Sequence, residues 1–143
     1  MGKAQERQAN MIGLLRQWQG LEREAIETTA TIMEETDNLL IRQIMEIIRN
    51  DSVQHHRVQQ FIIDTMTKEA VTLRAEDLAE IWGRIEEHDK LERQTIELAK
   101  ELKETTHDHV HKILLDYLIR DEEKHDSLLG ELEEFKKHLS KLA

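Results

Sequence analysis

The chain repeats itself. Residues 11–65 return seventy positions later as residues 81–135, with about ten of 55 aligned pairs identical. Such a low identity is weak evidence of a repeat by itself. However, the identical pairs include one Glu, one Asp and one His in each half, all at the same offset: Glu22 and Glu92, Asp51 and Asp121, His55 and His125. A chain of this kind is expected to form one structural unit twice, with these polar side chains at matching places.

Composition and hydrophobic periodicity together predict an all-α protein. The chain has 143 residues, no proline, five glycines and 35% charged residues, which suits one domain rich in helix. A 3.6-residue period of apolar positions predicts four helices, over residues 8–35, 38–65, 76–104 and 107–139. The breaks between them are rich in Ser, Thr, Asp and Asn, which accept hydrogen bonds from the free amides of a following helix. The halves 8–65 and 76–139 are therefore predicted to be two helical hairpins.

The predicted inward stripes are mostly apolar but contain carboxylates. The stripes follow the helical period. Apart from Ser52 and the Glu and His residues discussed below, they consist of Met11, Leu15, Trp18, Ala25, Thr29, Ile32, Ile41, Ile44, Ile48, Ile62, Ile81, Ile85, Thr95, Ala99, Leu102, Leu114, Leu118, Leu129 and Leu132. Glu22 and Glu92 lie in the middle of two of them. A buried carboxylate without a partner costs several kcal/mol or takes up a proton. These positions therefore indicate a polar site.

The predicted turns bring these carboxylates level with histidines. A hairpin that turns near residue 38 places Glu22 and His55 at about the same height, and one that turns near residue 108 does so for Glu92 and His125. Glu122 precedes His125 by three positions, so both point to the same side of their helix. The sequence predicts that all five side chains converge on one layer, where carboxylates and imidazoles can bind divalent metal ions.

This pattern resembles that of the ferritin-like, rubrerythrin-type di-iron carboxylate superfamily. In that superfamily the first and third helices each supply a Glu, and the second and fourth each supply Glu-x-x-His. The resemblance covers residues 10–135, and its most specific part is Asp-Glu-Glu-Lys-His at residues 121–125. It implies a ferritin-like four-helix bundle that holds two iron ions, with manganese or a mononuclear or mixed site as alternatives.

The resemblance also implies roles for the five ligands. Glu122 would bridge the ions, Glu22 and Glu92 would be terminal ligands, and His55 and His125 would each hold one ion. The implied activity is redox chemistry with oxygen or peroxide, or oxidation of ferrous iron, in an oxidoreductase of peroxidase or ferroxidase type.

Ser52 departs from this pattern, because it stands where the superfamily has a bridging Glu. A serine hydroxyl is a poor ligand for a hard divalent ion. Water could fill the gap and leave an open position, one ion could be lost, or the site could bind metal weakly. Ser52 therefore also favours an alternative function, a non-enzymatic helical scaffold or interaction protein with a structural or degenerate metal site. A zinc hydrolase is a weaker hypothesis, given the excess of carboxylates.

The ligands are expected to have polar neighbours. Asp51 and Asp121 directly precede the Ser/Glu positions, and each is predicted to accept a ring N–H from the opposite hairpin, Asp121 from His55 and Asp51 from His125. Such a contact fixes the tautomer of a ligating imidazole.

His88 lies one turn before Glu92 on the same predicted face. It could be a further ligand or a proton carrier. We expect a partly buried imidazole bonded to a neighbour such as Gln59.

Several classes of protein are disfavoured by composition. The absence of cysteine excludes disulfides, zinc–thiolate sites and iron–sulfur clusters, so reducing electrons would have to come from a separate donor. A net charge of −10 argues against binding to nucleic acid. No apolar run is long enough for a signal peptide or a membrane span, which predicts a cytoplasmic location. A homodimer is consistent with such a bundle.

The connector between the two halves is short. Residues 66–75 reach about 33–36 Å when extended, whereas a connection across the length of the bundle spans about 35–40 Å. We expect a stretched crossover, and the alternatives are an up-down-up-down bundle or a swapped dimer.

Overall fold

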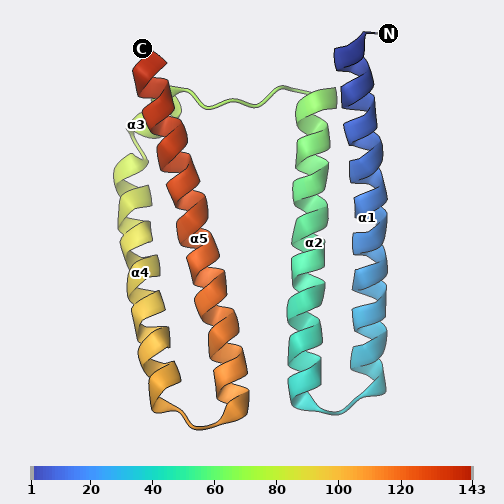
Figure 1. The fold of residues 1–143 in the computed structure, drawn as a ribbon, viewed down its shortest axis with the longest axis vertical. Coiled ribbons are helices and arrows are strands. Elements are labelled where there is room, and N and C mark those ends of the chain that lie inside the picture. Colours follow the sequence, from blue (N-terminus) through green and yellow to red (C-terminus); the bar gives the residue numbers. More distant parts are fainter. Residues whose placement is uncertain (1, 143) are drawn as a thin grey trace. The chain divides into compact units, whose positions relative to one another are not determined.

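The computed structural model describes residues 2–142, and side chains for residues 2–139. This part of the chain contains five helices and no strand (Figure 1). The helices are α1 (Lys3–Glu35), α2 (Leu39–Thr67), α3 (Ala75–Ala79), α4 (Trp82–Thr105) and α5 (His109–Leu142). The prediction of an all-α protein is confirmed, whereas the ferritin-like arrangement of its hairpins stays a prediction.

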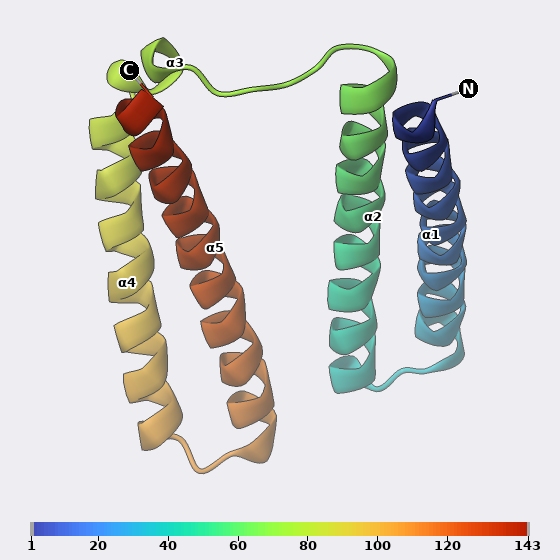
Figure 2. The ribbon, with the colours of Figure 1, turned by 45° about the horizontal axis from the view of Figure 1, so that its top comes forward.

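The chain divides into two compact units, Met1–Val71 and Thr72–Ala143. The first unit is a hairpin of α1 and α2, and the second is a hairpin of α4 and α5 with α3 packed against α5. Figure 2 shows the two long helices of each hairpin side by side from a second direction. The repeat halves predicted from the sequence correspond to these two hairpins.

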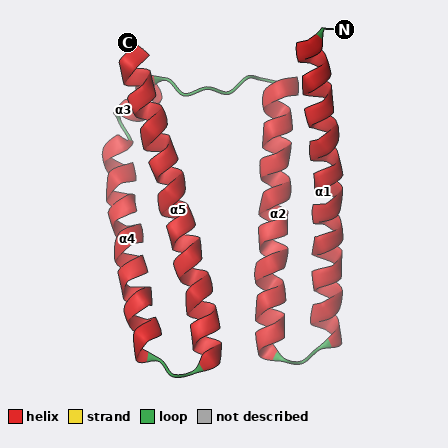
Figure 3. Cartoon of the chain, in the orientation of Figure 1, coloured by secondary structure: helices red, strands yellow, loops and turns green. Residues whose placement is uncertain are grey.

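The same turn closes both hairpins (Figure 3). The hydroxyl of Thr36 accepts the backbone N–H of Asn38 at 3.1 Å, and that of Thr106 accepts the N–H of Asp108 at 3.2 Å. Asn38 Oδ1 then accepts an N–H from the first turn of α2 at 3.0 Å, and Asp108 Oδ1 accepts two from α5 at 2.8 and 3.2 Å. These caps satisfy amides that a helix start leaves unpaired.

The prediction of the third helix was wrong for its first residues. The helix expected over residues 76–104 is interrupted at residues 80–81, which separates α3 from α4. The start of α3 is capped, because the Asp77 carboxylate accepts the Arg74 backbone N–H at 2.9 Å. Near its end, Leu78 is buried. The helix-free connector therefore shrinks to residues 68–74, which extend to about 25 Å. The expected crossover stays a prediction.

The face that each hairpin buries is narrower than the sequence suggested. The buried residues are those that each helix turns toward its partner: Gln19, Thr29, Ser52, Gln59, Ile63, Leu78, Glu92, Ile96, Ala99 and Ile119. Of the predicted stripe residues, Thr29, Ser52, Glu92 and Ala99 are buried and most of the other aliphatic ones are half-buried or exposed. Those that are exposed include Met11, Trp18, Ile32, Ile41, Ile48, Ile62, Ile81, Leu102 and Leu118. Two helices cover only the sides that face each other, and the stripes extend well beyond that contact. Each hairpin consequently leaves apolar side chains uncovered.

Candidate metal centre

Three of the predicted ligands come together within the second hairpin. Glu92 on α4 and Glu122 and His125 on α5 each offer one ligand atom, and these atoms lie within 4.8 Å of one another. His125 Nδ1 is 3.5 Å from Glu92 Oε1 and 3.9 Å from Glu122 Oε1. The three-residue spacing on α5 sets the last two side by side. This carboxylate–imidazole group could hold a metal ion.

The group contains a buried oxygen atom that lacks a hydrogen bond. The side chain of Glu92 is only 8% exposed, and its Oε2 has no hydrogen-bond partner. A buried carboxylate oxygen in that state is costly, and most such atoms in proteins are satisfied. A divalent cation among the three side chains would satisfy it. The residues present therefore fit a metal ion.

The two carboxylates shift each other's pKa in opposite directions. A hydrogen bond with Glu92 raises the pKa of Glu122, and burial and repulsion from the Glu92 charge raise it further. The same hydrogen bond lowers the pKa of Glu92, and His88 adds to this effect although burial opposes it. Like charges held this close favour one proton between them. A metal ion that binds here would displace that proton.

His88 adjoins the group through Glu92. Its Nε2 lies 2.8 Å from Glu92 Oε1, so this one oxygen faces the imidazoles of both His88 and His125. The expectation of a partly buried His88 was wrong, because its side chain is exposed. The partner is Glu92 on its own helix, one turn away. His88 therefore links the buried carboxylate to solvent.

Asp121 contacts the other side of the His125 ring. Its Oδ2 lies 3.5 Å from His125 Nε2, while His125 Nδ1 faces the two glutamates. A carboxylate at the far nitrogen orients a ligating imidazole and raises its basicity. The imidazole that Asp121 contacts is one turn away on its own helix. The predicted contacts between hairpins, Asp121 with His55 and Asp51 with His125, stay predictions.

The first hairpin holds the equivalents of only two of these three side chains. Glu22 Oε2 on α1 lies 3.3 Å from His55 Nδ1 on α2, which matches the contact between Glu92 and His125. This contact lacks hydrogen-bond geometry, so Glu22 Oε2 is also buried without a hydrogen-bond partner. Ser52 stands at the Glu122 position and is buried. The predicted layer of five ligands involves both hairpins together and stays a prediction.

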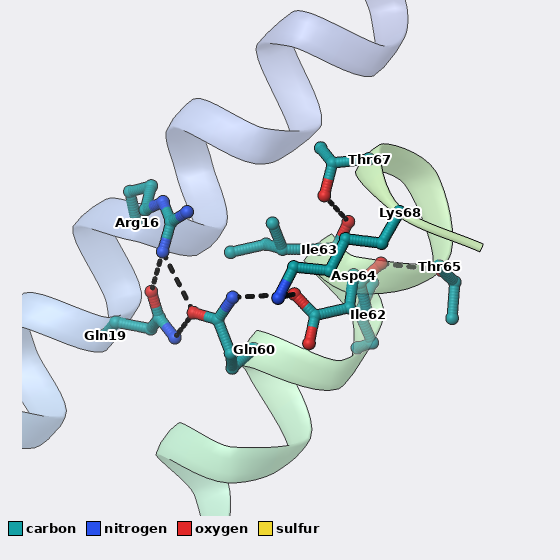
Figure 4. A network of polar contacts seen from close by, with 9 residues as sticks. All are labelled: Arg16, Gln19, Gln60, Ile62, Ile63, Asp64, Thr65, Thr67 and Lys68. Carbon is teal, nitrogen blue, oxygen red and sulfur yellow. Dashed lines mark hydrogen bonds and ion pairs between the residues drawn. The ribbon is translucent and has the colours of Figure 1, made fainter. Parts of the chain in front are cut away.

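An amide network connects the helices of the first hairpin (Figure 4). The buried Gln19 donates to Gln60 Oε1 at 3.1 Å and to the His56 backbone carbonyl at 3.3 Å. Arg16 donates to both glutamines at 2.9 and 3.1 Å, and Gln60 donates to Asp64 at 2.9 Å. Sequence reasoning missed this network. The signal was available, since Gln19 lies one turn before Glu22 on the face toward α2.

Carboxylates replace these groups in the second hairpin. Asp89 and Asp126 occupy the positions of Gln19 and His56 and share a hydrogen bond that raises the pKa of Asp89 and lowers that of Asp126. Arg93 lies 2.9 Å from Asp89 and 3.5 Å from Asp126. This second acidic pair was not predicted either. Its charge is partly balanced by Arg93, which distinguishes it from the pair of glutamates.

Comparison of the chain with protein-family models, with curated proteins and with solved structures finds no match. None of the helices in residues 2–142 combines the length and apolar character needed to cross a membrane. The chemistry of the second hairpin is therefore the basis for a functional assignment.

Proposed function

We propose that the protein binds a divalent transition-metal ion, preferentially iron, at Glu92, Glu122 and His125. We further propose that it uses this ion for redox chemistry with oxygen or peroxide, or to oxidise ferrous iron. The observation that carries the proposal is the buried, unpartnered Oε2 of Glu92 inside a group of three metal-ligating side chains. Carboxylate and imidazole ligands suit Fe(II) and Mn(II).

Each side chain has a definite task in this proposal. Glu92 and Glu122 supply the negative charge, after the proton between them is released. His125 offers Nδ1 to the ion while Asp121 accepts the Nε2–H, which fixes the tautomer. His88 can carry a proton between Glu92 Oε1 and solvent. The bound iron would supply the one-electron redox chemistry, and a separate donor would supply electrons, because the chain contains no cysteine.

One observation favours a second candidate function, a helical scaffold with a structural metal. The first hairpin has Ser52 in place of a ligand, and a hydrogen-bonded amide network around Gln19 links its two helices. If the metal is structural, its removal should lower the melting temperature, and ferrous iron with peroxide should give no turnover.

The test is an anaerobic titration of metal-free protein with Fe(II) or Mn(II), followed by peroxide. We expect one ion per chain bound at the second hairpin, and consumption of peroxide by the reduced protein. Glu122→Ala should abolish both, whereas Glu123→Ala, an exposed carboxylate next to it on α5, should change neither. Absence of binding by the unaltered protein would contradict the proposal. Binding without turnover would favour the scaffold.

A further inference from the structure

The second hairpin exposes an apolar face that belongs to α4 and α5 together. Its large side chains are roughly half exposed: Leu91, Leu98, Leu102, Val110, Leu118, Leu128 and Phe135. On α4, the three leucines lie about 100° around the helix from Glu92, which points toward α5. The helical period turns the exposed side chains of α5 to the same side of the hairpin. The α4–α5 hairpin therefore has an apolar face that its own helices do not cover.

The metal-ligating group lies at the edge of this face. His125 is 60° around α5 from Glu122, in the direction of the exposed side chains, and its side chain is 41% exposed. Hard divalent ions take about six ligands, whereas the hairpin supplies three side chains. The three side chains would therefore leave the coordination of an ion incomplete, on the side of the hairpin that carries the apolar face.

We propose that the α4–α5 hairpin of a second copy of this chain covers this face and completes the metal site. The proposal rests on the proposed metal binding. Two facing groups would supply four carboxylates and two imidazoles to two adjacent ions, and each ion would gain ligands where a carboxylate of one copy, which has two oxygens, also contacts the ion of the other. Among the two halves of the repeat, only the second carries all three ligands, because Ser52 replaces the third in the first half. Six ligating side chains therefore come together only when the α4–α5 hairpins of two copies pair with each other.

The size and symmetry of the face suit a pair of identical copies. Seven large apolar side chains, each 41–62% exposed, are more than the single scattered surface hydrophobics that need no explanation, and each partner in a standard specific complex buries ~800 Å². A two-fold interface uses the same patch on both copies. It would set each Glu92–Glu122–His125 group against its equivalent.

The test measures the oligomeric state and Mn(II) affinity of the full chain by sedimentation velocity and titration. We expect a dimer with two ions, or one per chain. Leu91→Glu places a charge in the face and should give a monomer that binds Mn(II) at least tenfold more weakly. Leu21→Glu is the matched control, because Leu21 is the equivalent position in the first half and is 57% exposed against 59% for Leu91.

Circular dichroism checks that each variant stays helical, and Leu91→Ala is the milder variant if Leu91→Glu unfolds. A metal-bound monomer, or a Leu91→Glu variant that keeps both dimer and affinity, would overturn the second copy and leave the proposed metal binding intact. A dimer lost in Leu21→Glu but kept in Leu91→Glu would overturn the assignment to α4–α5. Absence of Mn(II) binding by the unaltered chain would overturn both proposals.

Discussion

The two hairpins share a frame but differ in what they place inside it. Both are closed by a threonine-led turn, and in both an arginine of the first helix reaches the second: Arg23 contacts His56 at 3.1 Å and Arg93 contacts Asp126 at 3.5 Å. Both also pair a buried Glu with a His across the helices. Only the second adds Glu122. Of the two similar hairpins, only the second therefore brings together three side chains that could hold a metal ion.

The residues around the Glu–His pairs also differ between the two hairpins. The first hairpin fills its interior with amides that hydrogen-bond to one another, and Arg16 and Asp64 balance in charge. The second uses two carboxylate pairs, and in each pair one member raises the pKa of the other. Neutral amides carry no charge that a cation would balance, whereas paired carboxylates attract a cation. The asymmetry favours one strong metal site per chain.

The largest expected effect comes from removing the equivalent glutamate in each half. Glu92→Ala should weaken Fe(II) or Mn(II) binding at least about a hundredfold, because loss of a ligand costs several kcal/mol. Glu22→Ala should leave affinity within about twofold, since the first hairpin lacks a third ligand. Calorimetric titration of both variants measures the difference. Equal losses in the two variants would refute the asymmetry between hairpins.

A gain of metal binding is the next expected effect. Ser52→Glu gives the first hairpin the same three ligands as the second, at the same spacing. We expect the bound metal to rise from one ion to two per chain. The buried new carboxylate should destabilise the metal-free protein by about 1–3 kcal/mol, and added Mn(II) should restore the melting temperature. Ser52→Gln, of similar size but without the charge, is the control. An unchanged metal count in Ser52→Glu would contradict the prediction.

A smaller effect concerns stability of the metal-free protein. The raised pKa of Glu122 means that its contribution to folding is present at low pH and lost as the pH rises above the usual glutamate value of 4.5. The lowered pKa of Glu92 acts in the opposite direction, so its contribution is lost as the pH falls. At neutral pH both carboxylates can be charged and repel each other. Glu122→Gln removes that repulsion and keeps a hydrogen-bonding group.

We therefore expect Glu122→Gln to stabilise the metal-free protein at pH 7 by about 1 kcal/mol, or about 3 °C in melting temperature, while it abolishes metal binding. The gain over the unaltered protein should shrink as the pH falls through the raised pKa of Glu122, and should be gone once the pH is below the usual glutamate value of 4.5. Thermal melts from pH 4 to 8 measure it, with Glu123→Gln as the control. A variant less stable than the unaltered protein at pH 7 would show that the two carboxylates do not repel.

The parts of the structure that local chemistry decides could be predicted from the sequence. The caps at Asn38 and Asp108 mark both turns, and the three-residue spacing of Glu122 and His125 sets them on one side of a helix. The break before α4 could not be predicted from the helical period, because α3 packs against α5, which is distant in the sequence, and Leu78 is buried. The buried Gln19 and the Asp89–Asp126 pair also escaped, since periodicity defines an apolar stripe but not which side of it a neighbouring helix covers.

Metal content per chain is the most direct test of the central claim that the second hairpin is the metal-binding half of this repeat. The protein should be produced in medium with iron and manganese, and purified without chelators or a nickel column, for elemental analysis. We predict about one ion per chain in the unaltered protein and in Glu22→Ala, and none in Glu92→Ala. Absence of metal from the unaltered protein, or equal metal in the two variants, would contradict the claim.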